Sequence, residues 1–214
     1  RLMARILRQG TLTQERKEKF QGYLELVETE TRRCSQIVSN LLSFSRKSPP
    51  SFGEVHIDEL LQRCIILSQH RLQLSHISLD ASILPDLPTV KGDFNQLQQC
   101  VINLIFNSID AMGEGGDLKL DGGYDSREGR VIVTVKDSGP GISSEDLPRI
   151  FEPFYTTKKE GYGVGLGLST VYGIMQHHHG TVTVESTPGQ GAAFMLRLPV
   201  SPVGPADCVG GGML

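Results

Sequence analysis

The sequence contains no tryptophan, and only 6% of its 214 residues are aromatic. It has no apolar run of about eighteen residues, the length that a membrane-spanning helix needs, and no signal-peptide pattern. Its net charge of −3 at pH 7 lacks the basic excess that marks a nucleic-acid-binding surface. From these absences we expect that this stretch of chain contacts neither a membrane nor nucleic acid.

Cysteine is also scarce. The four cysteines, Cys34, Cys64, Cys100 and Cys208, form no Cys-x-x-Cys pair, so a disulfide framework is not expected. The hydrophobic fraction of 38% and the charged fraction of 21% are ordinary for a globular protein. The chain begins at Arg1, within a helical pattern and without an initiator methionine, so we expect it to be part of a longer protein.

Residues 1–47 have the apolar pattern of a helical hairpin. Residues 1–9 resemble the last turns of an amphipathic helix, and a long helix is predicted from about 15 to 47. The apolar residues of helix 15–47 cover two sides, which a helix packing alone would leave exposed. We therefore predict that residues 1–47 form a dimerisation domain, a homodimeric four-helix bundle joined through helix 15–47. The alternative is an amphipathic helix that lies on the next domain of the same chain.

A second domain is predicted at residues 55–199, after a linker at residues 48–54 that contains two prolines. Apolar residues at three- and four-residue spacing predict helices at 56–74, 93–112 and 166–175, the middle one capped by Asp93. Alternating patterns predict strands at 76–80, 118–120, 131–135, 181–185 and 192–198. Polar loops are expected at 121–129 and 143–161, and the Pro/Gly-rich tail 200–214 is expected to be disordered.

The segregation of helices from antiparallel strands predicts the α+β class. We expect an α/β sandwich, in which a mixed, mostly antiparallel sheet carries the helices on one face. The loops between the two layers would then hold a ligand.

Two asparagines are the first candidates for such a site. Asn103 and Asn107 lie one turn apart on the predicted helix 93–112, so their side chains share one side of it. Taken alone, such a pair is typical of the polar face of a helix.

Two glycine-rich segments follow. Residues 137–142 (Asp-Ser-Gly-Pro-Gly-Ile) place an acid after strand 131–135 and two glycines in a tight turn. Residues 161–168 (Gly-Tyr-Gly-Val-Gly-Leu-Gly-Leu) open into a helix whose first backbone amides can hold phosphate. Taken singly, an Asp before Gly indicates a turn, and a Gly-x-Gly-x-Gly run indicates a flexible loop.

The order of these segments, with residues 151–158 (Phe-Glu-Pro-Phe-Tyr-Thr-Thr-Lys) between the glycine-rich ones, resembles the ATP-binding domain of sensor histidine kinases, within the gyrase-type ATPase superfamily. The segments match that family's asparagine box, first glycine box, phenylalanine box and second glycine box. The resemblance covers about residues 54–199, and a weaker one covers residues 1–47. It implies the Bergerat-type ATP-binding fold, with ATP and Mg2+ as cofactors.

The resemblance also implies roles for individual residues. Asp137 would accept a hydrogen bond from the adenine amino group, and Asn107 would bind Mg2+ through its side-chain oxygen. Asn103 stands where the superfamily's hydrolases carry a glutamate that activates water; an amide cannot act as a general base, which favours a kinase. The implied catalytic residues are Asn103, Asn107 and Lys158. The implied cofactor-binding residues are Asn103, Asn107, Asp137, Gly139, Gly141, Ile142, Phe151, Phe154, Lys158, Gly163, Val164, Gly165, Leu166, Gly167 and Leu168.

Plainer roles remain open for several of these residues. Asp137 would otherwise cap a turn, Asn103 would lie on a polar helix face, and Lys158 would be solvated. Phe151 and Phe154 would either anchor a mobile lid or fill the core, and the two roles are compatible. The lid implied by the resemblance spans residues 143–162 and would close over bound nucleotide.

The phosphoacceptor histidine of the family is missing from the sequence. In the family it lies in the first helix of the hairpin, followed by an acid and usually by Asn-Pro, and residues 1–9 resemble only the end of that helix. The first histidine here, His56, lies beyond the second helix and lacks the motif. We therefore expect that the dimerisation domain is truncated and that this piece does not phosphorylate itself.

The run His177-His178-His179 invites a metal-binding interpretation. Consecutive side chains diverge, so a shared metal ion is not expected. The family often has one histidine followed by two glycines here. His179 therefore stands where glycine is usual, which leaves the geometry of that turn open.

These observations predict the cytoplasmic kinase core of a two-component sensor, an ATP-dependent protein-histidine kinase. It would transfer the γ-phosphoryl group to a histidine of the dimerisation domain, and then to an aspartate of a response-regulator receiver domain. A membrane anchor elsewhere in the parent protein is compatible with this prediction. One alternative is a gyrase-type ATPase, which the lack of an acid at position 103 disfavours. The other is a non-catalytic nucleotide-binding or docking module, which the intact glycine boxes disfavour.

Overall fold

The computed structural model describes residues 17–28, 31, 51–158 and 164–201. The chain divides into two compact units. The larger comprises Pro49–Tyr155 and Gly165–Leu214, and the smaller comprises Arg1–Ser48 and Thr156–Val164.

The larger unit is built on a five-stranded sheet with the strand order β2-β4-β5-β7-β6. Strands β2 and β4 are parallel, and the other neighbouring strands are antiparallel. The bounds of the strands are Ile77–Ile83 (β2), Gly116–Asp125 (β4), Arg130–Asp137 (β5), Thr181–Ser186 (β6) and Ala192–Pro199 (β7). A small antiparallel sheet joins β1, Gly53–Val55, to β3, Val90–Gly92.

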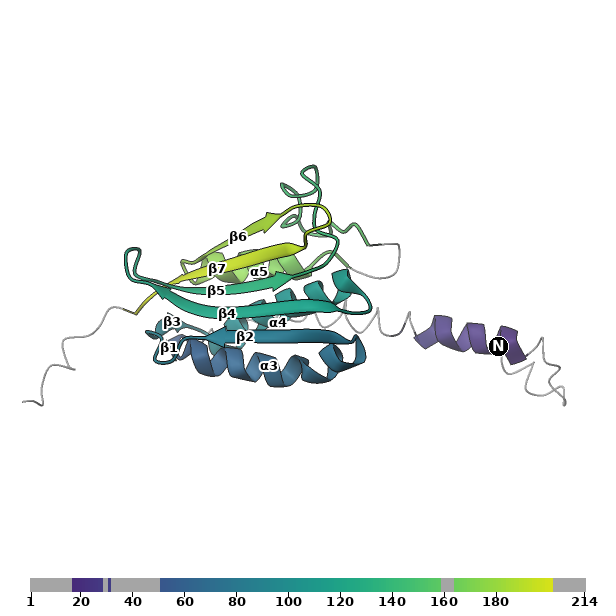
Figure 1. Ribbon diagram of the computed structural model, residues 1–214, viewed down its shortest axis with the longest axis horizontal. Coiled ribbons are helices and arrows are strands. Elements are labelled where there is room, and N and C mark those ends of the chain that lie inside the picture. The colour runs from purple at the N-terminus through teal and green to yellow at the C-terminus, as the bar shows by residue number, and fades with distance from the viewer. Residues whose placement is uncertain (1–16, 29–30, 32–50, 159–163, 202–214) are drawn as a thin grey trace, which may run out of the picture. The chain divides into compact units, whose positions relative to one another are not determined.

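Three helices cover one face of the five-stranded sheet (Figure 1): α3 (Ile57–Leu74), α4 (Phe94–Met112) and α5 (Gly167–His177). Alternate residues of the strands face the helices and are buried, as Val131, Val133 and Val135 of β5 show. The core between the layers also contains Leu104 and Ile105 of α4. The predicted α+β sandwich, with a mixed and mostly antiparallel sheet, is therefore confirmed.

Helix α4 begins as the sequence predicts. The Asp93 side chain accepts hydrogen bonds from the backbone N–H groups of Asn95 (2.9 Å) and Gln96 (3.0 Å), two donors that the helix itself leaves unpaired. The helix ends at Gly113, whose φ of +70° is readily accessible to glycine. These bounds position the two asparagines of the candidate site.

Some strand predictions were too short. β2 continues to Ile83, and β4 continues to Asp125, so the predicted loop 121–129 is wrong over its first five residues. β4 pairs with β2 on one side and β5 on the other, and this backbone hydrogen bonding extends a polar stretch that has little strand pattern. Gly53 and Glu54 of β1 fall within the segment predicted as a linker.

In the smaller unit, residues 17–28 are helical, as expected for part of helix 15–47. Leu24, Leu26 and Val27 are each about half exposed in the single chain. The remainder of the predicted hairpin, residues 1–16, 29–30 and 32–47, lies outside the described residues, and so does the tail from residue 202. None of the described helices is long and apolar enough to cross a membrane.

The structure shows the geometry of the turn after α5, where His179 stands in place of the family's usual glycine. His178 is the C-cap of α5, and His179 has a φ of +54°, the left-handed conformation that glycine adopts without strain. The chain thus keeps the backbone geometry of a glycine at a position occupied by histidine.

We predict that His179→Gly stabilises the protein. Relief of left-handed strain, about 1–2 kcal/mol, should exceed the entropy that glycine adds to the unfolded chain, about 0.4–1 kcal/mol. The free energy of unfolding in urea should rise by about 0.5–1 kcal/mol. His177→Gly, in the last turn of the helix, is the matched control and should lower it. A loss of stability in the His179 variant would contradict the assignment of strain to this residue.

Candidate functional site

The carboxyl of Asp137 is buried and accepts three hydrogen bonds. Asp137 ends β5 on the side that faces the helices, and the residue is only 4% exposed. Its Oδ1 accepts hydrogen bonds from the backbone N–H groups of Gly139 (2.9 Å) and Ala192 (3.2 Å). Its Oδ2 accepts one from the hydroxyl of Ser108 on α4 (3.0 Å). Three segments that are distant in sequence therefore meet at this carboxyl.

The first glycine-rich turn packs against the turn between β6 and β7. A Cβ on Gly141, which has a φ of +73°, would lie 2.2 Å from the backbone oxygen of Thr187. The Ile142 N–H donates to the Ser186 hydroxyl (2.8 Å), which in turn donates to the Gly191 carbonyl (2.7 Å). Only glycine fits at position 141, because the neighbouring backbone occupies the space that a side chain would need.

Asn103 and Asn107 both lie beside the start of α5. The Asn103 side-chain amide donates to the Gly167 carbonyl (3.4 Å). A Cβ on Gly167 would lie 3.5–3.8 Å from the side-chain amide atoms of Asn107. Within the described part of the chain, the Asn107 amide has no hydrogen-bond partner, so its oxygen can accept from or coordinate a ligand. Helix α4 thus brings Asn107 to α5 and the next residue, Ser108, to Asp137.

The first turn of α5 has no side-chain cap. Leu166 is the N-cap residue, and its side chain provides no acceptor for the first helical N–H groups. The hydroxyls of Ser169 and Thr170 instead donate to the Leu166 carbonyl, at 3.1 Å and 2.7 Å. The Leu166 side chain is buried and that of Leu168 packs against the core, so the polar groups that this turn offers a ligand are its backbone groups and the Ser169 and Thr170 hydroxyls.

Phe154 and Gly165 are joined by a backbone hydrogen bond. The Phe154 N–H donates to the Gly165 carbonyl (2.9 Å), and a Cβ on Gly165 would lie 2.4 Å from the Phe154 carbonyl carbon. Phe154 has a φ of +67° and a side chain that is 68% exposed, whereas Phe151 packs against the core and the ring of Tyr172. Of the two candidate aromatic anchors, Phe151 is therefore the one that packs against the core.

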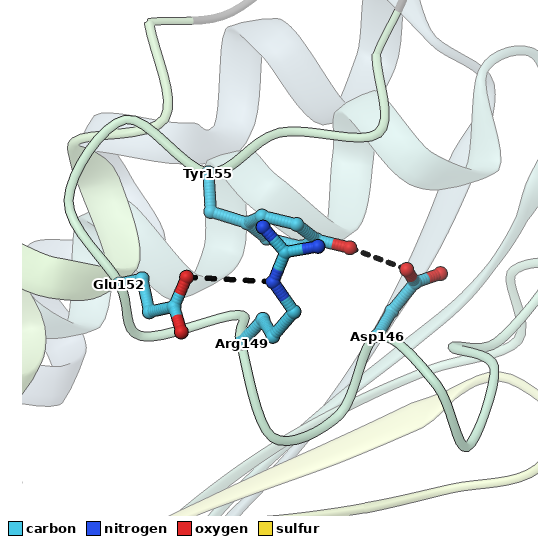
Figure 2. A network of polar contacts seen from close by, with 4 residues as sticks. All are labelled: Asp146, Arg149, Glu152 and Tyr155. Atoms are coloured by element: carbon cyan, nitrogen blue, oxygen red, sulfur yellow. Dashed lines mark hydrogen bonds and ion pairs between the residues drawn. The ribbon is translucent and has the colours of Figure 1, made fainter.

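A polar network links residues of the segment 146–155, which includes Phe154 (Figure 2). The Tyr155 hydroxyl donates to Asp146, and the Arg149 guanidinium lies over the Tyr155 ring at 4.4 Å and pairs with Glu152. The hydrogen bonds from Tyr155 and then from Ser143 lower the pKa of Asp146, and the bond to Asp146 raises the pKa of Tyr155. The network connects the turn at Asp146 to the residue beside Phe154.

The structure places several of the residues that the sequence singles out in two groups. Asn103, Asn107 and Gly167 lie together, and Asp137 lies with Gly139 at the other side of α4. Lys158 and Val164 belong to the smaller unit, and Gly163 lies outside the described residues, so the roles of these three remain predictions.

Four site residues were missed by sequence reasoning: Ser108, Ser186, Thr187 and Ala192, whose N–H donates to Asp137. Ser108 carries a signal in hindsight, because it is a polar residue that follows Asn107 on the apolar side of α4 and is 1% exposed. The roles of Ser186 and Thr187 depend on the contact between two turns and have no local signature.

Among the residues that the structure describes, no group of three or more His, Cys, Asp and Glu side chains could hold a metal ion. A divalent cation at Asn107 would need most of its ligands from a bound molecule.

Comparisons with known proteins identify the family. A family profile described as "Histidine kinase-, DNA gyrase B-, and HSP90-like ATPase" matches residues 92–202. Sporulation kinase E of Bacillus subtilis (strain 168) is 32% identical over 183 residues, which cover 83% of this chain and 24% of that protein. The chain therefore spans about a quarter of the length of that curated relative.

Solved structures show the same fold. Full-length ShkA in complex with AMPPNP is similar with a TM-score of 0.71 and 29% identity, over 93% of this chain and 42% of that one. Histidine kinase ThkA in complex with the response regulator TrrA is similar with a TM-score of 0.73 and 26% identity, over 94% of this chain and 56% of that one. The chain therefore belongs to the histidine kinase-, DNA gyrase B- and HSP90-like ATPase family, and its relatives include sensor histidine kinases.

Proposed function

We propose that the larger unit binds Mg-ATP along helix α4, with the adenine at Asp137 and the phosphates at the start of α5. The observation that carries the proposal is the placement of Asn107 beside Gly167 and of Ser108 against Asp137. The two ends of a nucleotide would therefore be held by consecutive residues of one helix. The AMPPNP complex of the similar protein ShkA supports a nucleotide of this kind.

The Asp137 carboxyl suits the exocyclic amino group of adenine. A carboxylate offers about four acceptor positions, and the three protein donors at Asp137 leave room for one more. Because those donors fix its orientation before binding, the carboxyl needs no rearrangement to accept an N–H from the base. Inosine has a carbonyl in place of the amino group. Because the carbonyl and the Asp137 carboxylate are both hydrogen-bond acceptors, they could not bond to each other.

The Asn107 side chain is suited to coordinate a magnesium ion that is bound to the nucleotide. The side-chain oxygen is a hard ligand without a protein partner among the described residues, and the α5 amides that lack a side-chain cap lie nearby. Magnesium would neutralise charge on the phosphates during transfer. The chain's own contribution is to position the phosphates at the α5 N-terminus, where backbone N–H groups and the helix dipole favour anions.

Asn103 favours phosphoryl transfer to protein over hydrolysis. Its amide donates to the Gly167 carbonyl, so it holds α4 against α5. An amide has no basic pair with which to activate water, so ATP would not be lost to solvent by general-base catalysis at this position. This argument separates the proposal from a gyrase-type ATPase.

For the whole protein we propose an ATP-dependent protein-histidine kinase of a two-component system, acting in the cytoplasm. The γ-phosphoryl group would pass to a histidine of the dimerisation domain and then to a receiver aspartate of a response regulator, as the ThkA–TrrA complex suggests. Homodimerisation through helix 15–47 would cover the half-exposed Leu24, Leu26 and Val27. Residues 143–162 would close over ATP, with Lys158 near the phosphates.

We predict that Asp137→Asn weakens binding of ATP by at least about tenfold and lowers the preference for ATP over ITP, because the amide N–H groups oppose the donors now bonded to the carboxyl. Titration calorimetry with both nucleotides measures this. Asp80→Asn, on the exposed side of β2, is the control and should change neither value. Since Asp137→Asn can also unfold the domain, Ser108→Ala serves as a milder variant with the same expected loss of ATP preference. Unchanged ATP preference in both variants would argue against adenine at this carboxyl.

We also predict that this sequence, joined to a hairpin helix that carries the family's phosphoacceptor histidine, labels itself with γ-labelled ATP and Mg2+. The label should be stable in base and labile in acid, as expected of phosphohistidine. Asn107→Ala should abolish labelling, because the phosphates lose their metal, and His70→Ala, on the exposed side of α3, should not.

Two other results of that assay would overturn the proposal. Free phosphate without labelled protein would indicate a hydrolase and would show that the argument from Asn103 is wrong. Bound nucleotide with neither product would indicate a non-catalytic docking module.

A further inference from the structure

The middle histidine of the run 177–179 is buried, although its neighbours are exposed. His178 is 1% exposed, whereas His177 and His179 face solvent. A Cβ on Gly92 would lie only 2.6 Å from Cδ2 and 3.0 Å from Nε2 of the His178 ring. The ring of Phe52 stacks on it with centroids 4.9 Å apart. The imidazole therefore fills a specific space between the end of α5 and the strand that leads into α4.

Both nitrogens of this ring have a backbone partner of known polarity. Nδ1 lies 2.8 Å from the Ile174 carbonyl, which can only accept, so Nδ1 carries the hydrogen. Nε2 lies 3.0 Å from the backbone nitrogen of Asp93, whose N–H can only donate, so Nε2 is the acceptor. The two bonds select one neutral tautomer and leave no nitrogen for a metal ion.

The acceptor bond joins the two helices of the candidate site. Asp93 is the N-cap of α4, and His178 is the C-cap of α5. The helices pack side by side, with the Cys100 thiol 3.9 Å from the Val171 carbonyl near the middle and Asn103 bonded to Gly167 at the other end. His178 therefore fixes the end of this pair that lies away from Gly167.

We propose that His178 is a positioning residue, which in its neutral form holds α5 in register with α4 and keeps Gly167 beside Asn103 and Asn107. Protonation would convert Nε2 from an acceptor into a donor that faces the Asp93 N–H. The hydrogen bond between the two helices would then break. Nucleotide binding would weaken in acid as a result. This inference rests on the proposed function of the site between the two helices.

The surroundings of His178 place this change at acidic pH. Burial lowers the pKa of His178 below its ordinary value of 6.5, against the bond to Ile174, which raises it. The positive charges of His177 and His179 also lower it, and the Asp93 carboxyl raises it. Phe52, which covers the ring, adds no charge.

The direction in which stability changes with pH follows from the pKa of His178 in the unfolded and the folded chain. The unfolded chain binds a proton at His178 with the ordinary pKa, and the folded chain binds it only at lower pH. The stability contributed by the neutral ring is therefore fully present above about pH 6.5 and is lost as the pH falls from there through the folded pKa.

The test is the dissociation constant of Mg-AMPPNP, measured between pH 8 and pH 5.5 for the wild-type chain and for His178→Gln. The wild-type affinity should fall severalfold toward the acidic end, and by no more than about tenfold, because one proton that binds with a pKa below 6.5 can weaken binding at pH 5.5 by no more than that. Glutamine can accept one hydrogen bond and donate another without titrating, so His178→Gln should bind within about threefold of wild type at pH 8 and keep most of that affinity in acid. The double variant His177→Gln/His179→Asn is the control and should retain the wild-type loss.

A measurement on the wild-type chain alone covers the case in which His178→Gln does not fold. The ¹⁵N chemical shifts of His178 should show the tautomer protonated at Nδ1, and they should change over the same pH range as the affinity. A shift pattern for the other tautomer, or a pKa of His178 above its ordinary value of 6.5, would overturn the inference.

The outcomes separate this inference from the proposed function. Tight binding at pH 8 with no loss in acid, or an equal loss in His178→Gln, would overturn the role of His178 and leave the nucleotide site intact. The absence of AMPPNP binding at pH 8 in the wild-type chain would overturn the proposed function, and the role of His178 with it.

Discussion

The buried carboxyl of Asp137 is the constraint on which the rest of the site depends. A buried acceptor without donors costs about 1–3 kcal/mol or more, so the fold must deliver hydrogen bonds to it. The donors come from the turn after β5, from the start of β7 and from α4, at Gly139, Ala192 and Ser108. Satisfying this one group therefore fixes the glycine turn, the sheet and the helix relative to one another.

Helix α4 carries the consequences of that constraint to α5. Its apolar side packs on the sheet through residues such as Leu104 and Ile105, while Asn103 and Asn107 lie along the contact with α5. Hydrogen bonds at both ends of α5 set how this helix lies against α4: Asp93 bonds to His178, and Asn103 bonds to Gly167. The uncapped first turn of α5 is held in place by contacts that leave its backbone N–H groups available.

Much of this arrangement could be predicted from the sequence, because it is encoded locally. The Asp93 cap, the apolar period of α4, the alternation of β5 and the succession of motifs from Asn103 to Gly167 are all readable from neighbouring residues. The family resemblance added roles for those residues that spacing alone does not supply. What the structure added is that α4 presents Asn107 and Ser108 to different partners.

The features of the fold and site that could not be predicted from the sequence depend on contacts between distant segments. Ser108 and Asp137 are 29 residues apart, and His178 and Asp93 are 85 residues apart, so no local pattern could pair them. The extension of β4 through Asp125 depends on strands on both sides of it. The glycine at position 141 is predictable as a turn residue, but its neighbour Thr187 is known only from the packing of two turns.

The most direct test of the account is to observe where a nucleotide contacts the protein, by titrating the ¹⁵N-labelled chain and following its backbone amide resonances. Adenosine alone should shift the amides of Gly139 and Ala192, beside Asp137, and Mg-ATP should shift those of Gly167 and Leu168 as well. Amides of Lys119 and Thr183, on the sheet face without helices, should remain unchanged. Shifts confined to that face, or an adenosine response at Gly167 and none at Gly139, would contradict a site that runs from Asp137 along α4 to the start of α5.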